Sequence, residues 1–239
     1  MMATADDSAE ANADSGIPGR LAEVRARIAR AARQAGREPG DVRLVAISKF
    51  QPLSAIRAAF TAGQMDFGEN RAQELDTKLV EAPAGARWHF VGGLQRNKVK
   101  QVVGRVELIH SVDRVPLAEA IAAHAGRHDL CQRILIQVDV AGELHKGGCT
   151  PEQVPVLLER IAQLDGVSAV GLMTIPPIDA DPATMFARLR ALHARYVSGF
   201  PDLIELSMGM SADLEAAVAH GATIVRVGTA IFGARPGSQ

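Results

Sequence analysis

Lys49 closes a run of apolar residues, and its position is the strongest chemical signal in the chain. The run, residues 42–49, is rich in Val, Leu and Ile and is typical of a buried β-strand. Side chains alternate along a strand, so Lys49 is predicted to share the inward face with Val45 and Ile47. Burial favours the neutral amine, which can attack an aldehyde to form a Schiff base. The alternative is a strand-end lysine whose ammonium group reaches solvent.

A second cation is predicted on the same inward face near the end of the chain. In the run 223–228, Arg226 alternates onto one face with Ile224 and Gly228. A buried guanidinium needs an acceptor, which is either an internal carboxylate or a ligand. A ligand with an aldehyde for Lys49 and a ring nitrogen for Arg226 would satisfy both groups.

Two further segments have the composition of an anion site. In residues 207–213, Gly209 permits a close backbone approach and Ser211 is placed to cap the following helix. Gly228 and Thr229 offer a backbone N–H group and a hydroxyl after the last predicted strand. The simpler interpretation of the first segment is a plain serine cap that needs no ligand. Pyridoxal 5′-phosphate (PLP) combines an aldehyde, a phosphate and a ring nitrogen, and it meets all of these requirements.

The elements that must position these residues alternate between strands and helices. This order predicts parallel strands joined by right-handed crossovers. Eight such units favour a TIM-type (β/α)8 barrel, with its chemistry at the carboxyl ends of the strands, over an open doubly wound sheet. A helix at about 17–34 is extra, and we expect it to pack outside or beneath the barrel. The strands are predicted at 42–49, 65–68, 88–92, 106–110, 133–140, 167–174, 203–207 and 223–228, and the helices include 53–62, 71–80, 115–125, 151–164, 182–197 and 212–220.

Composition limits the class of protein. The chain has 239 residues, 47% of them hydrophobic and 22% charged, with a net charge of -1. This size suits one barrel domain at 17–239, preceded by a polar segment, 1–16, that we expect to be a disordered tail. We expect no nucleic-acid or membrane partner and a cytoplasmic location, because no basic excess or long apolar stretch is present. Cys131 and Cys149 have no metal-ligand or redox spacing and are expected to be reduced thiols.

Several separated segments closely resemble the pyridoxal phosphate homeostasis protein family, over about residues 17–235. Members of this family are single-domain PLP-binding barrels of the alanine racemase type (PLP fold type III), so the resemblance implies the same fold here. It also implies that Lys49 carries PLP as an internal aldimine and that Arg226 faces the pyridine nitrogen. The resemblance is carried by Ala46-Ile47-Ser48-Lys49, Phe67-Gly68-Glu69-Asn70, Trp88-His89-Phe90-Val91-Gly92, Leu94-Gln95-Arg96-Asn97-Lys98, Gly171-Leu172-Met173-Thr174-Ile175-Pro176, Leu206-Ser207-Met208-Gly209-Met210-Ser211 and the segment 226–233.

The same resemblance implies further site residues and partners. The family is usually described as a PLP carrier or regulator of vitamin B6 and amino-acid pools without established turnover. PLP-dependent apoenzymes are the implied acceptors, and a monomer is expected. Asp139 departs from the pattern, because relatives usually have asparagine there, and it could pair with Lys146 or Arg226. The implied phosphate positions are Ser207, Gly228 and Thr229, with Met208 and Ser211 beside them and Asn70 near the cofactor ring.

Other functions stay open at this point. A PLP-dependent amino-acid racemase would need a second base, and the only tyrosine, Tyr196, is expected in a helix far from the barrel mouth. A protonated Arg226 donates to the ring nitrogen without making a pyridinium, so the ring is a weak electron sink. A sugar-phosphate lyase would instead use Lys49 on its substrate. His89 and His110 are interpreted as structural, and we expect no metal site.

Overall fold

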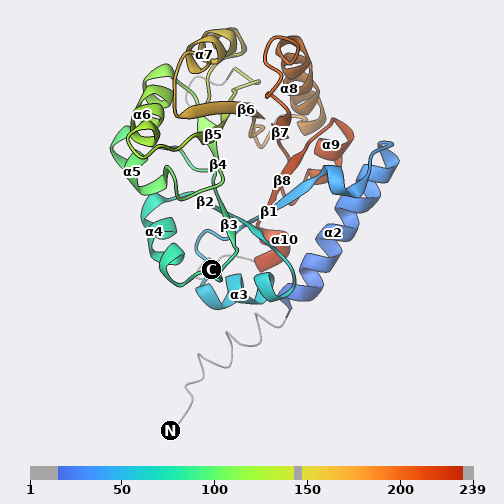
Figure 1. Ribbon diagram of the computed structural model, residues 1–239. Helices are drawn as coiled ribbons and strands as arrows, with labels where there is room; N and C mark the ends of the chain where they lie inside the picture. Colours follow the sequence, from blue (N-terminus) through green and yellow to red (C-terminus); the bar gives the residue numbers. More distant parts are fainter. Residues whose placement is uncertain (1–15, 143–146, 234–239) are drawn as a thin grey trace.

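Eight parallel strands close into a barrel surrounded by helices (Figure 1). The computed structural model describes residues 16–142 and 147–233, so the predicted tail, apart from Gly16, lies outside the described residues. The strands pair in chain order, and the last returns to the first. The TIM-type prediction is therefore confirmed. The strands are β1 (Arg43–Ile47), β2 (Asp66–Glu69), β3 (Arg87–Phe90), β4 (Leu108–Val112), β5 (Gln132–Gln137), β6 (Val167–Met173), β7 (Glu205–Ser207) and β8 (Ile224–Val227).

Helices form an outer ring and cover the strands (Figure 1). The predicted helices are all present, whereas several single-turn elements were not predicted because one turn shows no apolar periodicity. Within the described part of the chain, no helix has the length and apolar character needed to cross a membrane. The α-helices after β1 are α3 (Leu53–Thr61), α4 (Ala72–Glu81), α5 (Val99–Val102), α6 (Val115–Gly126), α7 (Val154–Ile161), α8 (Pro182–Tyr196), α9 (Leu214–Ala219) and α10 (Thr229–Phe232), and the 3-10 helices are η1 (Pro39–Asp41), η2 (Arg96–Lys98) and η3 (Pro151–Gln153).

The extra helix before the barrel, α2 (Ile17–Gln34), is confirmed and packs beside α3, α9 and α10 (Figure 1). Its buried apolar residues recur with helical spacing and form one stripe toward the barrel. Arg20 Nε donates to the Ile231 carbonyl at 2.6 Å, and Arg27 pairs with Glu215 at 2.7 Å. Because α10 is only 4 residues long, α2 covers the side of the barrel that α10 leaves open.

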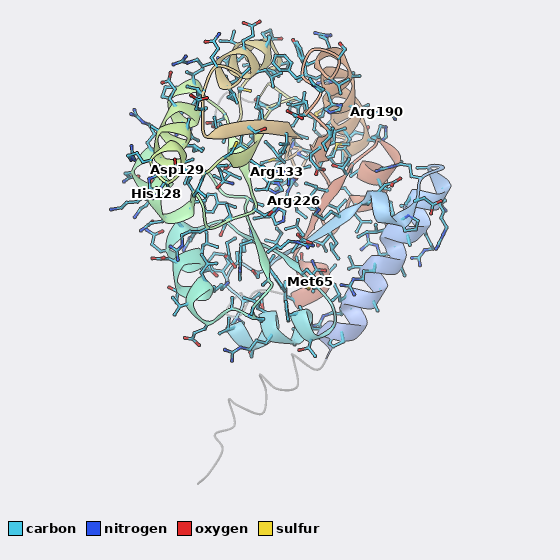
Figure 2. The ribbon with its side chains drawn as sticks, in the orientation of Figure 1. Met65, His128, Asp129, Arg133, Arg190 and Arg226 are labelled. Carbon is cyan, nitrogen blue, oxygen red and sulfur yellow. The ribbon has the colours of Figure 1, made fainter. Side chains whose placement is uncertain are left out.

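The apolar core has two parts because side chains alternate along each strand. One part lies between the strands and the helices, where Phe67 and Trp88 stack with ring centroids 5.7 Å apart. The other part lies inside the ring of strands. Arg226 also lies in this interior, whereas Arg190 on α8 lies at the periphery (Figure 2). The interior apolar residues are Val45, Leu108, Leu135, Val170, Met173 and Ile224, with Ile47 packed against them.

The predicted strand at 42–49 is too long at its carboxyl end, since β1 ends at Ile47. Gln51 N donates to the Ser48 carbonyl at 3.0 Å and closes a turn. Phe50 within this turn has a φ of 62°, in the left-handed region. Lys49 is therefore half-buried in a turn beyond the strand rather than in the strand itself.

The fourth strand was also misplaced, because it extends to Val112 rather than ending at His110. Ser111 interrupts the apolar run that marked the strand in the sequence. The Ser111 hydroxyl donates to the Gly92 carbonyl at 2.5 Å, and this bond satisfies a polar side chain within the barrel wall.

Gly209, in the loop after β7, should not tolerate a side chain. Its φ is 93°, and an added Cβ would lie 2.4 Å from the Ala217 Cβ atom on α9. We expect Gly209→Ala to lower the free energy of unfolding by about 2 kcal/mol or more, measured by urea denaturation. Gly19→Ala on α2 is the control, because nothing lies within 4 Å of the added atom and stability should rise by about 0.5–1 kcal/mol. Equal effects of the two substitutions would contradict the close approach at Gly209.

Candidate functional site

A cavity of about 310 Å³ opens at the carboxyl ends of β1 and β8. Chain segments that follow β1, β7 and β8 line it, as the barrel architecture requires of a functional site. The structure therefore brings together five of the predicted cofactor residues, which are Lys49, Ser211, Arg226, Gly228 and Thr229.

Arg226 is the buried cation of this cavity, with 4% of its surface exposed. Its Nη1 atom donates to Ser207 Oγ at 2.6 Å, and Nη2 donates to the Thr174 carbonyl at 2.9 Å. Burial lowers the pKa of Arg226 to about 10, so the guanidinium remains protonated at neutral pH. Among the described residues no carboxylate forms an ion pair with Arg226, so the alternative of an internal carboxylate is not found there, and two neutral acceptors bind the guanidinium. These two bonds use two of the five guanidinium N–H groups and leave others for a ligand.

A buried network of ion pairs and hydrogen bonds holds the turn that carries Lys49. Lys78 on α4 places its Nζ atom 2.7 Å from each of three oxygens: the Ser48 carbonyl, Glu69 Oε1 and Glu74 Oε1. The Ser48 hydroxyl also donates to Glu69 Oε1, at 2.6 Å. The residue just before Lys49 is thus fixed through both its carbonyl and its hydroxyl.

The residue after Lys49 is fixed by the same network. Phe50 N donates to Glu74 Oε1 at 2.6 Å, which holds the left-handed conformation that a residue other than glycine rarely adopts. Burial raises the pKa of Glu69, and its hydrogen bonds with Lys78 and Ser48 oppose that effect. The network therefore fixes the backbone on both sides of Lys49.

Hydroxyl groups from two loops meet at the other side of the cavity. Ser211 Oγ accepts from Ala230 N at 3.3 Å and lies 3.4 Å from Thr229 Oγ1. The expectation that Ser211 caps α9 is wrong, because the N-cap of α9 is Asp213. Met210 N donates to Asp213 Oδ1 at 2.5 Å, and this turn leaves the Ser211 hydroxyl directed at the start of α10.

Three residues assigned by the resemblance do not line the cavity. Ser207 and Met208 are fully buried, Ser207 behind Arg226 and Met208 in the core between strands and helices. Asn70 follows β2, and its Oδ1 atom is buried without a hydrogen-bond partner among the described residues. Asn70 does not cap α4, whose N-cap is Arg71.

Asp139 and Tyr196 have roles outside the cavity. Asp139 Oδ1 accepts from Ala141 N at 3.0 Å and from Gly142 N at 2.9 Å, so this carboxylate closes a turn after β5. Its suggested pairing with Lys146 falls outside the described residues. Tyr196 ends α8 and packs against the apolar core. No group of three potential metal ligands occurs in the described part of the chain.

His89 and His110, which were predicted to be structural, are connected to the site. His110 Nδ1 lies 2.9 Å from Ser207 Oγ, and His110 Nε2 lies 3.0 Å from His89 Nδ1. Both rings are fully buried, and burial lowers the pKa of His110 well below its usual value, with the charge of Arg226 acting in the same direction. A signal was present in the sequence, because alternation places both histidines on inward faces of consecutive strands.

His89 continues to a carboxylate at the amino end of the barrel. Its Nε2 atom lies 3.2 Å from Asp66 Oδ1, and Arg87 binds both Asp66 oxygens at 2.9 and 2.6 Å. Burial raises the pKa of Asp66, but the hydrogen bonds from Arg87 and His89 outweigh this effect and hold it well below its usual value. Asp66 is therefore a carboxylate at neutral pH.

Comparison with known proteins agrees with this architecture. The family described as alanine racemase, N-terminal domain, matches residues 20–236. Together with the closed barrel and the lysine and arginine at its carboxyl end, this match defines a barrel of the alanine racemase N-terminal class.

Curated relatives and a solved structure narrow the class. The pyridoxal phosphate homeostasis protein of Pseudomonas aeruginosa is 45% identical over 227 residues, which cover 92% of this chain and 96% of the relative. That of Aquifex aeolicus is 43% identical over 222 residues, covering 90% and 97%. The structure of PipY from Synechococcus elongatus with PLP bound is 38% identical, with a TM-score of 0.78, and covers 91% of this chain and 100% of PipY. The chain belongs to the pyridoxal phosphate homeostasis protein family, as the sequence motifs predicted.

Lys78 should be more important for stability than its place on an outer helix suggests. We expect Lys78→Met to lower the free energy of unfolding by about 3 kcal/mol at neutral pH, because the fully buried Glu69 loses its cation. The loss should shrink at a mildly acidic pH, because the raised pKa of Glu69 lets the carboxylate take up a proton as the pH falls. Arg105→Ala, which breaks the exposed pair with Asp76, is the control and should cost less than about 1 kcal/mol. Denaturant unfolding at the two pH values tests this, and a small loss at neutral pH would contradict it.

Proposed function

We propose that this protein binds PLP and takes part in PLP homeostasis as a carrier or regulator. The single observation that carries the proposal is the meeting of Lys49, Arg226 and the hydroxyls of Ser211 and Thr229 in one cavity. An amine, a guanidinium and a pair of hydroxyls match the aldehyde, the pyridine nitrogen and the phosphate of PLP. The structure of the relative PipY with PLP bound supports PLP as the ligand.

The residues of the cavity fit PLP as a set. Arg226 has N–H groups beyond those given to Ser207 and Thr174, and a ring nitrogen would accept one of them. Ser211 and Thr229 would hold the phosphate with the backbone at Gly228, where the short α10 begins. Asn70 would lie near the ring, and its unpartnered Oδ1 atom is consistent with a polar neighbour that the protein does not supply.

Lys49 is the group that would hold PLP covalently. Its amine would add to the aldehyde carbon and form a C–N double bond, with the aldehyde oxygen and the two amine protons leaving as water. The network of Lys78, Glu69 and Glu74 keeps the turn in place on both sides of that amine. The protein would then release PLP by the reverse reaction, with water as the nucleophile.

A carrier or regulator fits the site better than an enzyme. Arg226 stays protonated and donates to the ring nitrogen, so it does not create the pyridinium that stabilises carbanions most strongly. The only tyrosine, Tyr196, packs in the core and does not line the cavity, so it is not placed as the second base of a racemase. On this proposal the protein is a cytoplasmic monomer that passes PLP to PLP-dependent apoenzymes.

The test of the covalent site is replacement of Lys49. The protein mixed with PLP should absorb visible light as a Schiff base does, and borohydride should fix the cofactor on Lys49, as located by peptide mass spectrometry. We expect Lys49→Ala to abolish the band and the label, because the amine is removed. Lys100→Ala, on the exposed surface after β3, should change neither. A label on another lysine, or a band that survives in Lys49→Ala, would overturn the site, and a colourless wild-type protein would favour a lyase that uses Lys49 directly on a sugar phosphate.

The test of catalysis uses single enantiomers of amino acids. We expect the PLP-loaded protein to show a spectral change without continuing conversion of either enantiomer, because among the described residues no second base lines the cavity. Chiral chromatography over many equivalents of substrate measures this directly. Sustained formation of the opposite enantiomer, absent in Lys49→Ala, would establish the racemase alternative.

A further inference from the structure

A continuous line of polar side chains crosses the apolar interior of the barrel. It begins at Asp66 on β2, passes through His89 on β3 and His110 on β4, and reaches Ser207 on β7 and Arg226 on β8. The successive distances are 3.2, 3.0, 2.9 and 2.6 Å. The line therefore joins the amino end of the barrel to the cavity at the carboxyl end.

The two ends of the line fix the direction of every hydrogen bond in it. Asp66 is a carboxylate that only accepts, and Arg226 is a guanidinium that only donates. If both histidines are neutral with the proton on Nε2, His89 donates to Asp66, and His110 donates to His89 Nδ1. Ser207 then donates its only proton to His110 Nδ1 and accepts from Arg226 Nη1. Each proton in the line has one acceptor.

The other arrangements leave a buried group without a partner. If the His89 ring were a cation, it would donate to His110 Nε2, and His110 would donate from Nδ1 to Ser207. The Ser207 oxygen would then accept from both sides. Its own proton would have no acceptor among the described residues, although Ser207 is fully buried. An unsatisfied hydroxyl in this interior is unfavourable, which selects the neutral line.

We propose that Ser207 and His110 are positioning residues, which hold Arg226 as a donor aimed at the ligand in the cavity. His110 Nδ1 accepts the hydrogen bond from the Ser207 hydroxyl, so a lone pair of the Ser207 oxygen faces Arg226. This inference rests on the proposed function for its ligand, and it gives Ser207 a role behind Arg226 rather than at the phosphate. The Thr174 carbonyl fixes the second nitrogen, so the guanidinium plane has two anchors.

The composition of the interior favours this role over simple packing. The neighbouring inward positions hold Val45, Leu108 and Leu135, which fill such an interior without buried polar groups. Two histidines and a serine are harder to bury, because each needs a partner. Within the described part of the chain the line ends at Arg226, the one member of it that lines the cavity.

The first test measures the tautomers directly and does not depend on PLP. Long-range proton–nitrogen correlation spectra of the labelled full chain should show both buried histidines neutral, with hydrogen on Nε2 and a bare Nδ1. The pattern should be the same before and after PLP is added. A proton on Nδ1 of His110, or a charged His89 ring, would overturn the proposed direction.

The second test separates the two nitrogens of His110. In His110→Asn the amide oxygen can take the place of Nδ1 and accept from Ser207, whereas in His110→Gln the amide reaches only the place of Nε2. We expect His110→Asn to keep the PLP affinity and visible band of the wild type. His110→Gln and Ser207→Ala should each weaken PLP binding about tenfold and shift the band, as loss of one hydrogen bond implies.

Controls distinguish positioning from damage to the core. Thermal unfolding of the variants without PLP measures the effect of each substitution on core packing. As a second control, Thr229→Ala should weaken PLP binding without altering the histidine spectra. Equal losses in His110→Asn and His110→Gln would overturn the positioning role. Failure of the wild type to bind PLP would overturn the proposed function instead. The histidine spectra would still test the direction of the hydrogen bonds, because they do not depend on PLP.

Discussion

The burial of the Arg226 guanidinium inside the ring of strands is the constraint on which the rest of the structure depends. A cation removed from water must be compensated, and the interior of a barrel offers few acceptors because the strand backbones bond to each other. This protein supplies one hydroxyl and one backbone carbonyl, Ser207 and Thr174, at the carboxyl ends of β7 and β6. Both are neutral, so the positive charge is retained and directed toward the cavity rather than cancelled.

Lys49, the second basic residue of the site, is less buried than Arg226. Lys49 is placed past the end of its strand, in a half-buried turn, where the amine keeps access to the cavity. The structure fixes the neighbouring residues instead, through the Lys78 network and the left-handed Phe50. On the proposed function, a rigid buried donor and an amine at the cavity suit a ligand that is oriented firmly but attached reversibly.

The architecture and much of the site could be predicted from the sequence. The features that could be predicted depend on local patterns, and those that could not depend on contacts between distant segments. Alternating apolar residues mark a buried strand locally, so the strand runs and the inward faces of Val45 and Arg226 could be predicted. The end of β1 could not, because the turn at Lys49 is imposed by Lys78 and Glu74 from another helix. The link from His110 to Ser207 depends on strands 97 residues apart in the sequence, and no local pattern reports such a contact.

The contacts of α2 with the C-terminal part of the barrel determine how early this helix can pack. Arg20 and its acceptor on Ile231 are separated by 211 residues, and Arg27 binds Ser211 O and Glu215 near the same end of the chain. During synthesis α2 emerges long before the residues that it packs against. Until they are made, its apolar stripe is exposed to water or bound by a chaperone. Such distant pairings slow folding and expose the chain to aggregation. Arg20 can therefore complete its bond to the Ile231 carbonyl only after the 211 residues that separate them have been synthesised.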